Sequence, residues 1–462
     1  MIQNDTIAAI STPPGTGAIA IVRISGPESL KILSEIFSCS SADRDQRVQW
    51  SARSHEAIHG YIFDPESGDL VDEVVAIAYR GPNTYTGEDL VEINCHGSPL
   101  IARELLGLAL RLGARLACAG EFTKRSFLAG RMDLTQAEAV LDLIEAKTSR
   151  QSRLAISALD GHLGREIKKV RGILMEVLAK LIAGIDFPEE VGELPRDDLD
   201  PIIEDARKRL LDLADTANSG KFMRDGLKLA IVGRPNAGKS SLLNQLLKFE
   251  RAIVTDIPGT TRDSIEELVD LNGIPVVLVD TAGIRSTEDT VEKIGIDRTR
   301  QAITASDLAV FLLDPTQGFA DDESEIEAII EGRPHLLVIN KIDTGEDLDP
   351  PARAKEAALA LLQISARTGS GIKALTSAIE SFATGGGRLA ETGASLNDRQ
   401  ADLCRRAADS LELLRQSVEA DMLDDCLATD LKEAVHCLSE ACGDEVTEEV
   451  ISEVFSRFCI GK

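Results

Sequence analysis

The sequence predicts a multidomain protein of class α/β plus α, with a parallel-sheet domain lying between two helical stretches and behind an N-terminal α/β domain. Three observations lead to this prediction. The chain has 462 residues, which is too long for one hydrophobic core. Continuous apolar runs alternate with helical segments in its middle third. Apolar residues recur at helical spacing on both sides of that third.

The first part of the chain mixes strand and turn signals. Segments 18–24 and 71–79 are rich in Ile, Val and Ala, and Pro-Pro-Gly and Arg-Gly-Pro turns lie near their ends. Both segments are therefore expected to be strands. This mixture of strand and turn signals predicts an N-terminal α/β domain over residues 1–120.

Helical signals take over after residue 120. Apolar side chains between 134 and 144 recur at spacings of three and four, and Thr135 with Glu138 indicates a capping box. The stretch 186–201 is rich in Pro and acidic residues and is expected to be a loop. We expect a first helical part over 121–220.

The middle third predicts the parallel sheet. Its apolar runs are continuous rather than alternating, which indicates strands that are buried on both faces. A Gly-rich segment at 384–387 then marks a linker. We expect this domain over 221–384 and a second helical part over 385–462. The predicted strands are 227–232, 275–279, 308–313 and 336–339.

Composition limits the function. The net charge of −27 argues against non-specific binding to phosphate backbones, so a nucleic-acid partner would need a local basic patch or a partner subunit. The eight cysteines form no C-x-x-C pair and no zinc pattern. Without a long apolar run, a signal peptide or a transit peptide, the chain is expected to be cytoplasmic and not bound to a membrane.

Residues 233–240 read Gly-Arg-Pro-Asn-Ala-Gly-Lys-Ser and follow a predicted strand. This is the pattern of a phosphate-binding P-loop, whose backbone N–H groups surround the α- and β-phosphates. Lys239 would neutralise β- and γ-phosphate oxygens, and Ser240 would ligate Mg²⁺. The alternative is a chance glycine-rich turn, and the motifs that follow argue against it.

Three more motifs follow in order. Residues 280–283 (Asp-Thr-Ala-Gly) come after a buried strand, as a loop that binds magnesium and senses the γ-phosphate should. Residues 340–343 (Asn-Lys-Ile-Asp) end another strand, and the Asp343 carboxylate can accept two hydrogen bonds that guanine offers and adenine does not, which would reject adenine on the order of 10⁴-fold. Residues 365–367 (Ser-Ala-Arg) fit the loop that meets guanine O6. The sequence thus predicts a Ras-like P-loop GTPase domain that binds GTP.

The residue that orients the attacking water for GTP hydrolysis must differ here from the one that many GTPases use. Many GTPases place a Gln directly after the D-x-x-G motif to orient the attacking water. Here that position is Ile284, which cannot orient water. Another group must therefore do so.

These motifs together resemble the MnmE (TrmE) family of tRNA-modification GTPases. Further matches lie outside the GTPase domain, so the resemblance spans the whole chain. They include Asp-Leu-Thr-Gln-Ala-Glu-Ala at 133–139 and the C-terminal Phe-Cys-Ile-Gly-Lys at 458–462. The other matching segments are 12–15, 23–26, 85–89, 120–122, 233–244, 255–263, 280–285 and 291–296.

The resemblance implies an N-terminal domain that dimerises and binds a folate, and a GTPase domain inserted into the helical one. It also implies a homodimer that joins an FAD-dependent, MnmG-like subunit in a heterotetramer. That complex would bind tRNA and install a carboxymethylaminomethyl or aminomethyl group at C5 of the wobble uridine, with 5-formyl-tetrahydrofolate or a related folate as one-carbon source. A regulatory GTPase in ribosome assembly is the alternative.

The resemblance also implies roles for individual residues. GTP would be hydrolysed when two GTPase domains meet around a K⁺ ion, with Glu292 orienting water and Lys239 and Asn236 as further catalytic residues. K⁺ would be held by Asn236, Thr255, Ile257 and Thr260, and Mg²⁺ by Ser240 and Thr261. The expected nucleotide contacts are Asn236, Ala237, Gly238, Lys239, Ser240, Ser241, Thr255, Asp256, Ile257, Pro258, Gly259, Thr260, Thr261, Asp280, Thr281, Ala282, Gly283, Asn340, Lys341, Asp343, Ser365, Ala366 and Arg367.

The folate positions implied by the resemblance are Arg23, Glu92, Arg131 and Lys462. Cys459 lies in the C-terminal tail and does not fit a prenylation box, because Gly461 is not aliphatic and the chain ends in Lys. Its thiol would either assist chemistry at the folate pocket or only pack there.

Overall fold

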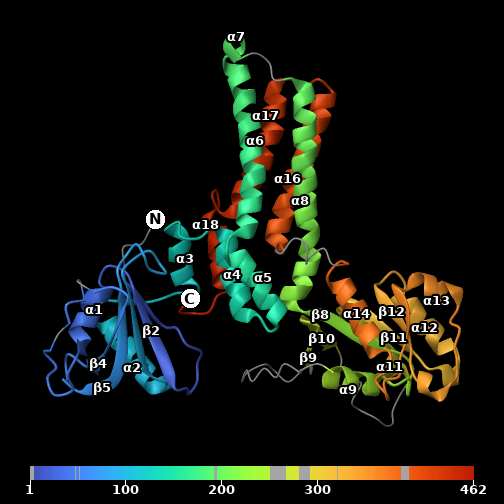
Figure 1. The fold of residues 1–462 in the computed structure, drawn as a ribbon, viewed down its shortest axis with the longest axis horizontal. Coiled ribbons are helices and arrows are strands. Elements are labelled where there is room, and N and C mark those ends of the chain that lie inside the picture. The colour runs from blue at the N-terminus through green and yellow to red at the C-terminus, as the bar shows by residue number, and fades with distance from the viewer. Residues whose placement is uncertain are drawn as a thin grey trace. The chain divides into compact units, whose positions relative to one another are not determined.

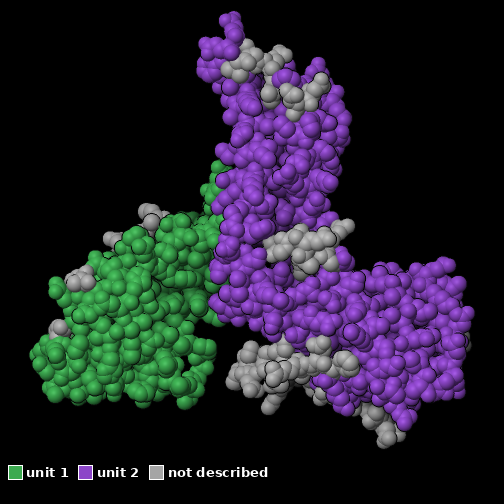
Figure 2. Space-filling model, in the orientation of Figure 1, with its two compact units in different colours: residues 1–141, 439–462 green, residues 142–438 purple. Residues whose placement is uncertain are grey.

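The computed structural model describes residues 5–46, 48–50, 53–191, 195–249, 267–279, 292–319, 321–386 and 395–462 (Figure 1). The chain divides into two compact units. One unit comprises residues 1–141 and 439–462, and the other comprises 142–438 (Figure 2). The last residues of the chain therefore belong to the same unit as the first ones.

The N-terminal unit is built on a seven-stranded sheet in the order β3-β4-β5-β6-β2-β1-β7. Neighbouring strands are antiparallel except for β1 and β7. The predicted strands at 18–24 and 71–79 are confirmed as β2 and β5. The elements are β1 (Ile7–Ile10), β2 (Ile19–Ser25), α1 (Ser29–Ile36), β3 (Phe37–Ser38), β4 (Glu56–Phe63), β5 (Leu70–Tyr79), β6 (Leu90–His96), α2 (Pro99–Arg111) and β7 (Arg115–Leu116).

One face of this sheet carries the core. Alternate side chains of β2, β5 and β6 pack with helices α1 and α2 around residues such as Val22, Ala76 and Ile93. The intervening side chains, Arg23 and Glu92 among them, point to the opposite face, because successive strand residues alternate. The sheet thus presents a polar pair on the face away from its core.

Both ends of the chain meet in this unit. Helices α3 (Glu121–Leu128), α4 (Leu134–Glu145) and α18 (Glu448–Ser456) share a core that includes Leu134, Phe455 and Phe458. The C-terminal tail then pairs with the segment before α3 through a bridge between Ala119 and Ile460. This packing holds the last residues against the N-terminal sheet.

The capping box predicted at Thr135 and Glu138 is wrong, because the structure places it two residues earlier. Asp133 Oδ1 accepts the Gln136 N–H at 3.1 Å, and Gln136 Oε1 accepts the Asp133 N–H at 3.0 Å. Thr135 lies inside the helix, and its hydroxyl donates to the same Asp133 carboxylate at 2.6 Å. The Asp133 carboxylate thus accepts hydrogen bonds from both the Gln136 N–H and the Thr135 hydroxyl. A cap at Thr135 would have no carboxylate to do this.

The second unit contains the helical domain. The long helices α8 and α16 pack along one another, and α6 packs on α8. The buried stripe of α6 contains the predicted positions Val170, Leu174, Val177 and Leu181. The helices are α5 (Ser149–Leu159), α6 (His162–Asp186), α7 (Pro188–Val191), α8 (Arg196–Asp225), α16 (Asp398–Glu419) and α17 (Asp424–Cys442). Within the described residues no helix combines the length and apolarity that crossing a membrane requires.

The loop predicted over 186–201 is largely helix instead. Helix α6 runs to Asp186, α7 follows, and α8 begins at Arg196 with Pro201 inside it. Pro201 lies in the second turn, where it removes one backbone hydrogen bond near the helix end. The packing of the 30-residue helix α8 along α16 outweighs that local cost.

The P-loop domain lies in the chain between α8 and α16, which confirms the predicted insertion between helical segments. Its six-stranded sheet has the order β13-β12-β11-β8-β10-β9 and is parallel except for the β9–β10 hairpin. The four predicted strands are confirmed. The elements are β8 (Leu227–Val232), α9 (Lys239–Phe249), β9 (Glu267–Leu271), β10 (Ile274–Val279), α11 (Glu292–Ala305), β11 (Leu308–Leu313), η2 (Pro315–Gln317), α12 (Asp321–Ile330), β12 (His335–Ile339), η3 (Ile342–Thr344), α13 (Ala352–Ala357), β13 (Ala360–Gln363) and α14 (Ile372–Ala383).

Polar contacts join the N-terminal end of α5 to this inserted domain. The Thr148 hydroxyl donates to the Gly273 carbonyl at 2.7 Å, and Arg150 pairs with Glu380 of α14 at 2.9 Å. The buried Gln151 side chain donates to the Met223 carbonyl at 2.5 Å, near the end of α8. Gln151 therefore satisfies a carbonyl that a helix end leaves without an intrahelical partner.

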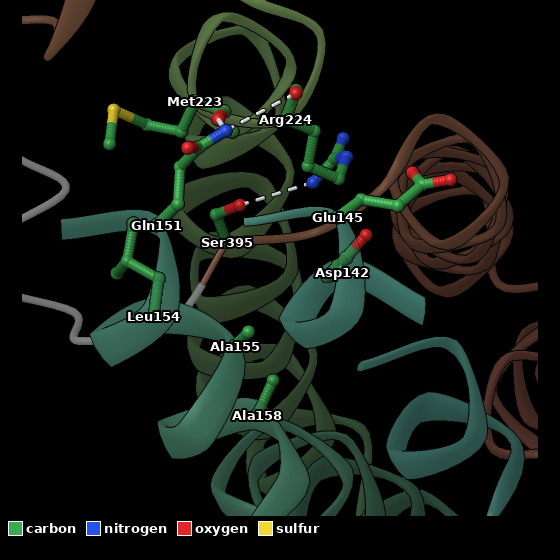
Figure 3. A pocket seen from close by; sticks show the side chains of 10 residues that line it. Asp142, Glu145, Gln151, Leu154, Ala155, Ala158, Met223, Arg224 and Ser395 are labelled. Carbon is green, nitrogen blue, oxygen red and sulfur yellow. Dashed lines mark hydrogen bonds between the residues drawn. The ribbon is translucent and has the colours of Figure 1, made fainter. Parts of the chain in front are cut away.

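A cavity of about 40 Å³ lies beside this joint and is lined by residues of α4, α5 and α8 and by Ser395 (Figure 3). Arg224 reaches across it and donates to the Ser395 hydroxyl at 3.3 Å. The volume suits one or two water molecules but is far below the several hundred Å³ of a nucleotide pocket. We therefore assign this cavity to the packing of the joint and not to ligand binding.

Candidate nucleotide-binding site

The P-loop follows β8 directly, and two of its glycines are required by close contacts. Gly233 has φ +153°, and a Cβ there would lie 2.4 Å from the Leu312 carbonyl oxygen. Gly238 has φ +100°, and its Cβ would lie 2.2 Å from the Asn340 side-chain nitrogen. Any side chain at either position would therefore push the loop away from the neighbouring strand ends.

Lys239 opens helix α9 and folds back over the loop. Its ammonium donates to the carbonyls of Gly233 at 2.7 Å and Arg234 at 2.8 Å. Burial lowers the pKa of Lys239 to about 8. The group thus lies where the backbone of the loop turns, with a charge that a bound phosphate would stabilise.

One side chain joins the P-loop to both base-recognition motifs. Asn340 is only 2% exposed. Its Nδ2 donates to the Ala237 carbonyl at 2.9 Å, and its Oδ1 accepts the Ala366 N–H at 2.9 Å. Asn340 lies 103 residues from Ala237 and 26 residues from Ala366 in the sequence, and the structure brings the three motifs together at the ends of parallel strands.

The Asp343 carboxylate is positioned by the third motif. Its Oδ1 accepts the Ser365 hydroxyl at 2.6 Å, and Arg367 lies 3.9 Å from its Oδ2. The hydrogen bond from Ser365 is the main cause that lowers the pKa of Asp343. The carboxylate is therefore ionised at neutral pH, as recognition of the guanine N1–H and amino group requires.

Asp314 belongs to this site and was missed by the motif analysis. It follows β11, is 3% exposed and accepts Lys341 Nζ at 2.6 Å. It also accepts the backbone N–H and the hydroxyl of Thr316 and the Gln317 amide, at 2.8 to 3.0 Å. Burial alone would raise the pKa of Asp314, but the hydrogen bonds from Lys341 and Thr316 hold it below its ordinary value. An acidic residue at the end of a fully apolar strand run was the signal available in the sequence.

The backbone conformation of Lys341 shows why its ion pair with Asp314 is needed. Its backbone has φ +62°, a left-handed conformation that is unusual for a lysine. The ion pair with Asp314 fixes its side chain next to the Asp343 loop. Asp314 therefore holds the base-recognition loop in a conformation that its own backbone does not favour.

Several predicted contacts fall outside the described residues. Helix α11 begins at Glu292, and nothing is described of that side chain. Ser240 and Ser241 lie in the first turn of α9, next to Lys239. The positions outside the described residues are Thr255, Asp256, Ile257, Pro258, Gly259, Thr260, Thr261, Asp280, Thr281, Ala282 and Gly283.

A second polar cluster lies in the N-terminal unit. The Arg23 guanidinium donates twice to Glu92 Oε1, at 2.6 and 3.0 Å, and Tyr79 OH donates to Glu92 Oε2 at 3.1 Å. The guanidinium also lies 5.5 Å from the centre of the Tyr85 ring and 5.6 Å from that of Phe122. The pair is thus half-buried between two aromatic rings.

The C-terminal tail reaches this cluster. The Gly461 carbonyl accepts the Ser11 hydroxyl at 3.0 Å and Arg23 Nη1 at 3.5 Å, and the Lys462 carbonyl accepts the Phe122 N–H at 3.1 Å. Burial and the nearby Arg23 lower the pKa of the Lys462 ammonium. Two ends of the chain therefore contribute to one charged site.

Two other predicted residues stand apart from Arg23 and Glu92. The described contact of Arg131 is a hydrogen bond to the Pro82 carbonyl at 2.6 Å. Cys459 is exposed with a free thiol, and its carbonyl accepts the Gly120 N–H at 3.4 Å. Three of the four proposed folate positions, Arg23, Glu92 and Lys462, are gathered.

Comparison with known proteins identifies the family. Residues 134–459 match the MnmE helical domain, and residues 6–131 match the GTP-binding protein TrmE N-terminus. The chain is 43% identical over 466 residues to the tRNA modification GTPase MnmE of Enterococcus faecalis (strain ATCC 700802 / V583), with 100% of this chain and 99% of that protein covered. It is 41% identical over 469 residues to the protein of the same name from Acetivibrio thermocellus (strain ATCC 27405 / DSM 1237 / JCM 9322 / NBRC 103400 / NCIMB 10682 / NRRL B-4536 / VPI 7372), with 100% of both chains covered. The chain belongs to the MnmE family.

Membership of the MnmE family accounts for the GTPase domain of the chain. The chain is a GTP hydrolase that acts in tRNA modification, as predicted from its motifs. The alternative of a ribosome-assembly GTPase is not retained, because the likeness to tRNA modification GTPases extends over the full length.

The pKa of Lys239 predicts how nucleotide binding depends on pH. A bound triphosphate stabilises the ammonium and raises its pKa above the value of about 8 in the free protein, so binding takes up a proton above that pH. GTP affinity should therefore fall as the pH rises above 8, by at most about tenfold per pH unit. Titrations of a fluorescent GTP analogue between pH 7 and 9.5 measure this. In Lys239→Arg the slope should vanish, because arginine stays charged; an unchanged slope in that variant would contradict the assignment.

The geometry around Asp343 predicts the base specificity. Replacing the carboxylate by an amide in Asp343→Asn turns one of the two acceptor oxygens for guanine into a donor, which opposes the guanine amino group and matches the xanthine carbonyl. We expect GTP affinity to fall on the order of 10³-fold and xanthosine triphosphate to become the better ligand. Competition binding with both nucleotides measures the preference. The exposed Asp347→Asn serves as control and should retain GTP preference; full GTP affinity in Asp343→Asn would refute the assignment.

Proposed function

We propose that this chain is a K⁺-activated GTPase that works with an FAD-dependent, MnmG-like subunit to modify C5 of the wobble uridine of certain tRNAs. A folate, 5-formyl-tetrahydrofolate or a relative, supplies the one-carbon unit of the carboxymethylaminomethyl or aminomethyl product. The observation that carries this proposal is the cluster of Arg23, Glu92 and Lys462, which gives the chain a second ligand site besides the P-loop.

The chemistry of this cluster fits a folate. Glu92 has four lone-pair positions and still has acceptor capacity for pterin N–H groups after its bonds to Arg23 and Tyr79. Arg23 and Lys462 provide positive charge for a carboxylated ligand, and the rings of Tyr85 and Phe122 pack against the Arg23 guanidinium and hold it in place. Arg131, which bonds to Pro82 in this structure, completes the proposed set.

The ion sites of the GTPase domain follow the same proposal. Asn236 is exposed at the P-loop with φ +63°, and its amide oxygen suits a K⁺ ion. Thr255, Ile257 and Thr260 would complete that site. Mg²⁺ would be held by Ser240 and Thr261. The cation would stabilise charge that develops between the β- and γ-phosphates, and Glu292 would orient the water.

The proposed assembly is a homodimer that joins two flavin-dependent subunits in the cytoplasm. Dimerisation through the N-terminal domain would bring two GTPase domains within reach of each other. The domain limits stay a prediction, with residues 1–120, 121–220, 221–384 and 385–462 as successive parts. The thiol of Cys459 would lie at the rim of the folate site, because its exposed side chain is three residues from Lys462.

Potassium activation predicts a clear salt effect. GTP turnover by the purified chain should be faster in KCl than in NaCl at equal ionic strength, on the order of ten- to a hundredfold. Asn236→Ala should remove most of the difference while nucleotide binding persists. Steady-state phosphate release measures both. Equal rates in the two salts would count against a K⁺ site.

The folate pocket is tested with Arg23→Ala. This variant should bind 5-formyl-tetrahydrofolate at least tenfold more weakly, because a charged hydrogen-bond donor is lost. Calorimetry measures the affinity, and nucleoside analysis of tRNA from complemented cells should show loss of the C5 modification. Arg103→Ala, an exposed arginine on α2, is the matched control and should change neither. Unaltered folate binding in Arg23→Ala would discredit the pocket.

A further inference from the structure

A concentrated positive charge lies at the start of the helical domain in a chain that is otherwise acidic. Residues 147–171 contain seven Lys and Arg side chains and two acidic ones, although the whole chain has a net charge of −27. Four of these cations fall within the first half of α6. We call them the α6 basic face, which consists of Arg165, Lys168, Lys169 and Arg171.

Helix geometry places two of these side chains away from the core. The buried stripe of α6 includes Leu163, Ile167 and Val170, and Arg165 and Lys169 lie on the opposite side of the helix. The side chains of Arg165 and Lys169, one helical turn apart, are 56% and 63% exposed. Lys168 and Arg171 are partly buried. The solvent-exposed part of the α6 basic face is therefore Arg165 with Lys169.

The exposed cations of the α6 basic face are held in ion pairs at the surface. Arg165 pairs with Asp160, whose side chain is 77% exposed, Lys169 pairs with Glu166, and Arg209 of α8 pairs with Asp205. The bond from Lys169 is the main cause of the lowered pKa of Glu166, and His162 and Arg209 of α8 act on the same carboxylate. Exposed ion pairs of this kind contribute little to stability, because solvent screens them. A polyanion can therefore replace them at small cost.

The positive charge ends half-way along α6. Between residues 172 and 190 there are four acidic residues and one basic residue, Lys180. A polyanion would thus be attracted to the first half of the helix, next to α5, and repelled from the second (Figure 1). The low aromatic content of 3% favours contacts to phosphates over stacking on bases.

We propose that the α6 basic face, with Arg209 of α8 beside it, binds the phosphate backbone of the tRNA substrate. The inference rests on the proposed function and assigns to this chain a direct contact with tRNA. It accounts for how an acidic protein can approach RNA, since a local strip of cations releases counterions where the average charge would repel. The contact is independent of base sequence and serves to orient the tRNA.

The test is the double charge reversal Arg165→Glu/Lys169→Glu in the full chain. Binding of fluorescein-labelled tRNA is measured by anisotropy over a KCl series, with and without the flavin-dependent subunit. Loss of two phosphate contacts should weaken binding about tenfold or more and reduce the slope of log K against log salt by about 1.5. GTP turnover in the absence of tRNA should stay at the wild-type rate, since both residues lie outside the nucleotide site.

The matched control Lys180→Glu/Lys432→Glu makes the same change in net charge at exposed lysines outside the strip and should bind tRNA as the wild type does. Equal losses in both variants, or wild-type binding by the α6 variant, would overturn the inference. So would loss of binding to the flavin-dependent subunit with intact tRNA binding, because the face would then serve an acidic protein surface. If the α6 variant binds tRNA normally and cells that express it still carry the C5 modification, the assigned surface is wrong and the proposed function stands. If cells with the wild-type chain lack the modification, the proposed function is wrong as well.

Discussion

The nucleotide site depends on the side-chain amide of Asn340. It is buried, and each of its two polar ends bonds to the backbone of a different loop, one in the P-loop and one in the Ser-Ala-Arg motif. An amide can do this because it combines a donor and an acceptor a few ångströms apart. Gly238 has to be a glycine because Asn340 occupies the space of its side chain. The P-loop and the Ser-Ala-Arg motif are thus held in fixed positions by one buried side chain.

The charged site in the N-terminal unit depends on a different constraint. The C-terminal end of the chain packs back against this unit. The tail packs Phe455 and Phe458 against α4 and then pairs with the segment around Ala119. Gly461 sits at φ +97°, and a Cβ there would lie 2.5 Å from the Ile10 carbonyl oxygen. The last lysine can reach Arg23 only because this glycine lets the tail approach the sheet so closely.

Much of the fold was visible in the sequence, for physical reasons that differ between elements. The strands 227–232 and 308–313 were predicted at their true limits, because a strand buried on both faces is apolar throughout and is bounded sharply by polar loops. The cap of α4 was assigned to Thr135 instead of Asp133, since both frames satisfy a capping pattern and only the helix start decides between them. Pro201 was interpreted as a helix breaker although tertiary packing overrides its local preference.

The residues of the candidate site also divide into those that the sequence motifs contain and those that the motifs do not contain. The motif residues Lys239, Asn340 and Asp343 were assigned from the sequence because phosphate and guanine chemistry dictates both residue type and spacing, and their binding roles stay a prediction. Asp314 could not be assigned in this way, because its partner Lys341 is 27 residues away and only the parallel pairing of β11 with β12 brings them together. Supporting contacts of this type depend on sheet order, which a linear pattern does not contain.

The joint between α5 and the β9–β10 hairpin links the P-loop domain to the helical domain. The hairpin lies in the chain between segments 250–266 and 280–291, which carry the motifs expected to surround the metal and the γ-phosphate. Its turn is fastened through the Gly273 carbonyl to the Thr148 hydroxyl, which also caps α5. A shift of the hairpin during the nucleotide cycle would therefore pull on the first turn of α5, and the stiff helices behind it would carry that movement through the helical domain.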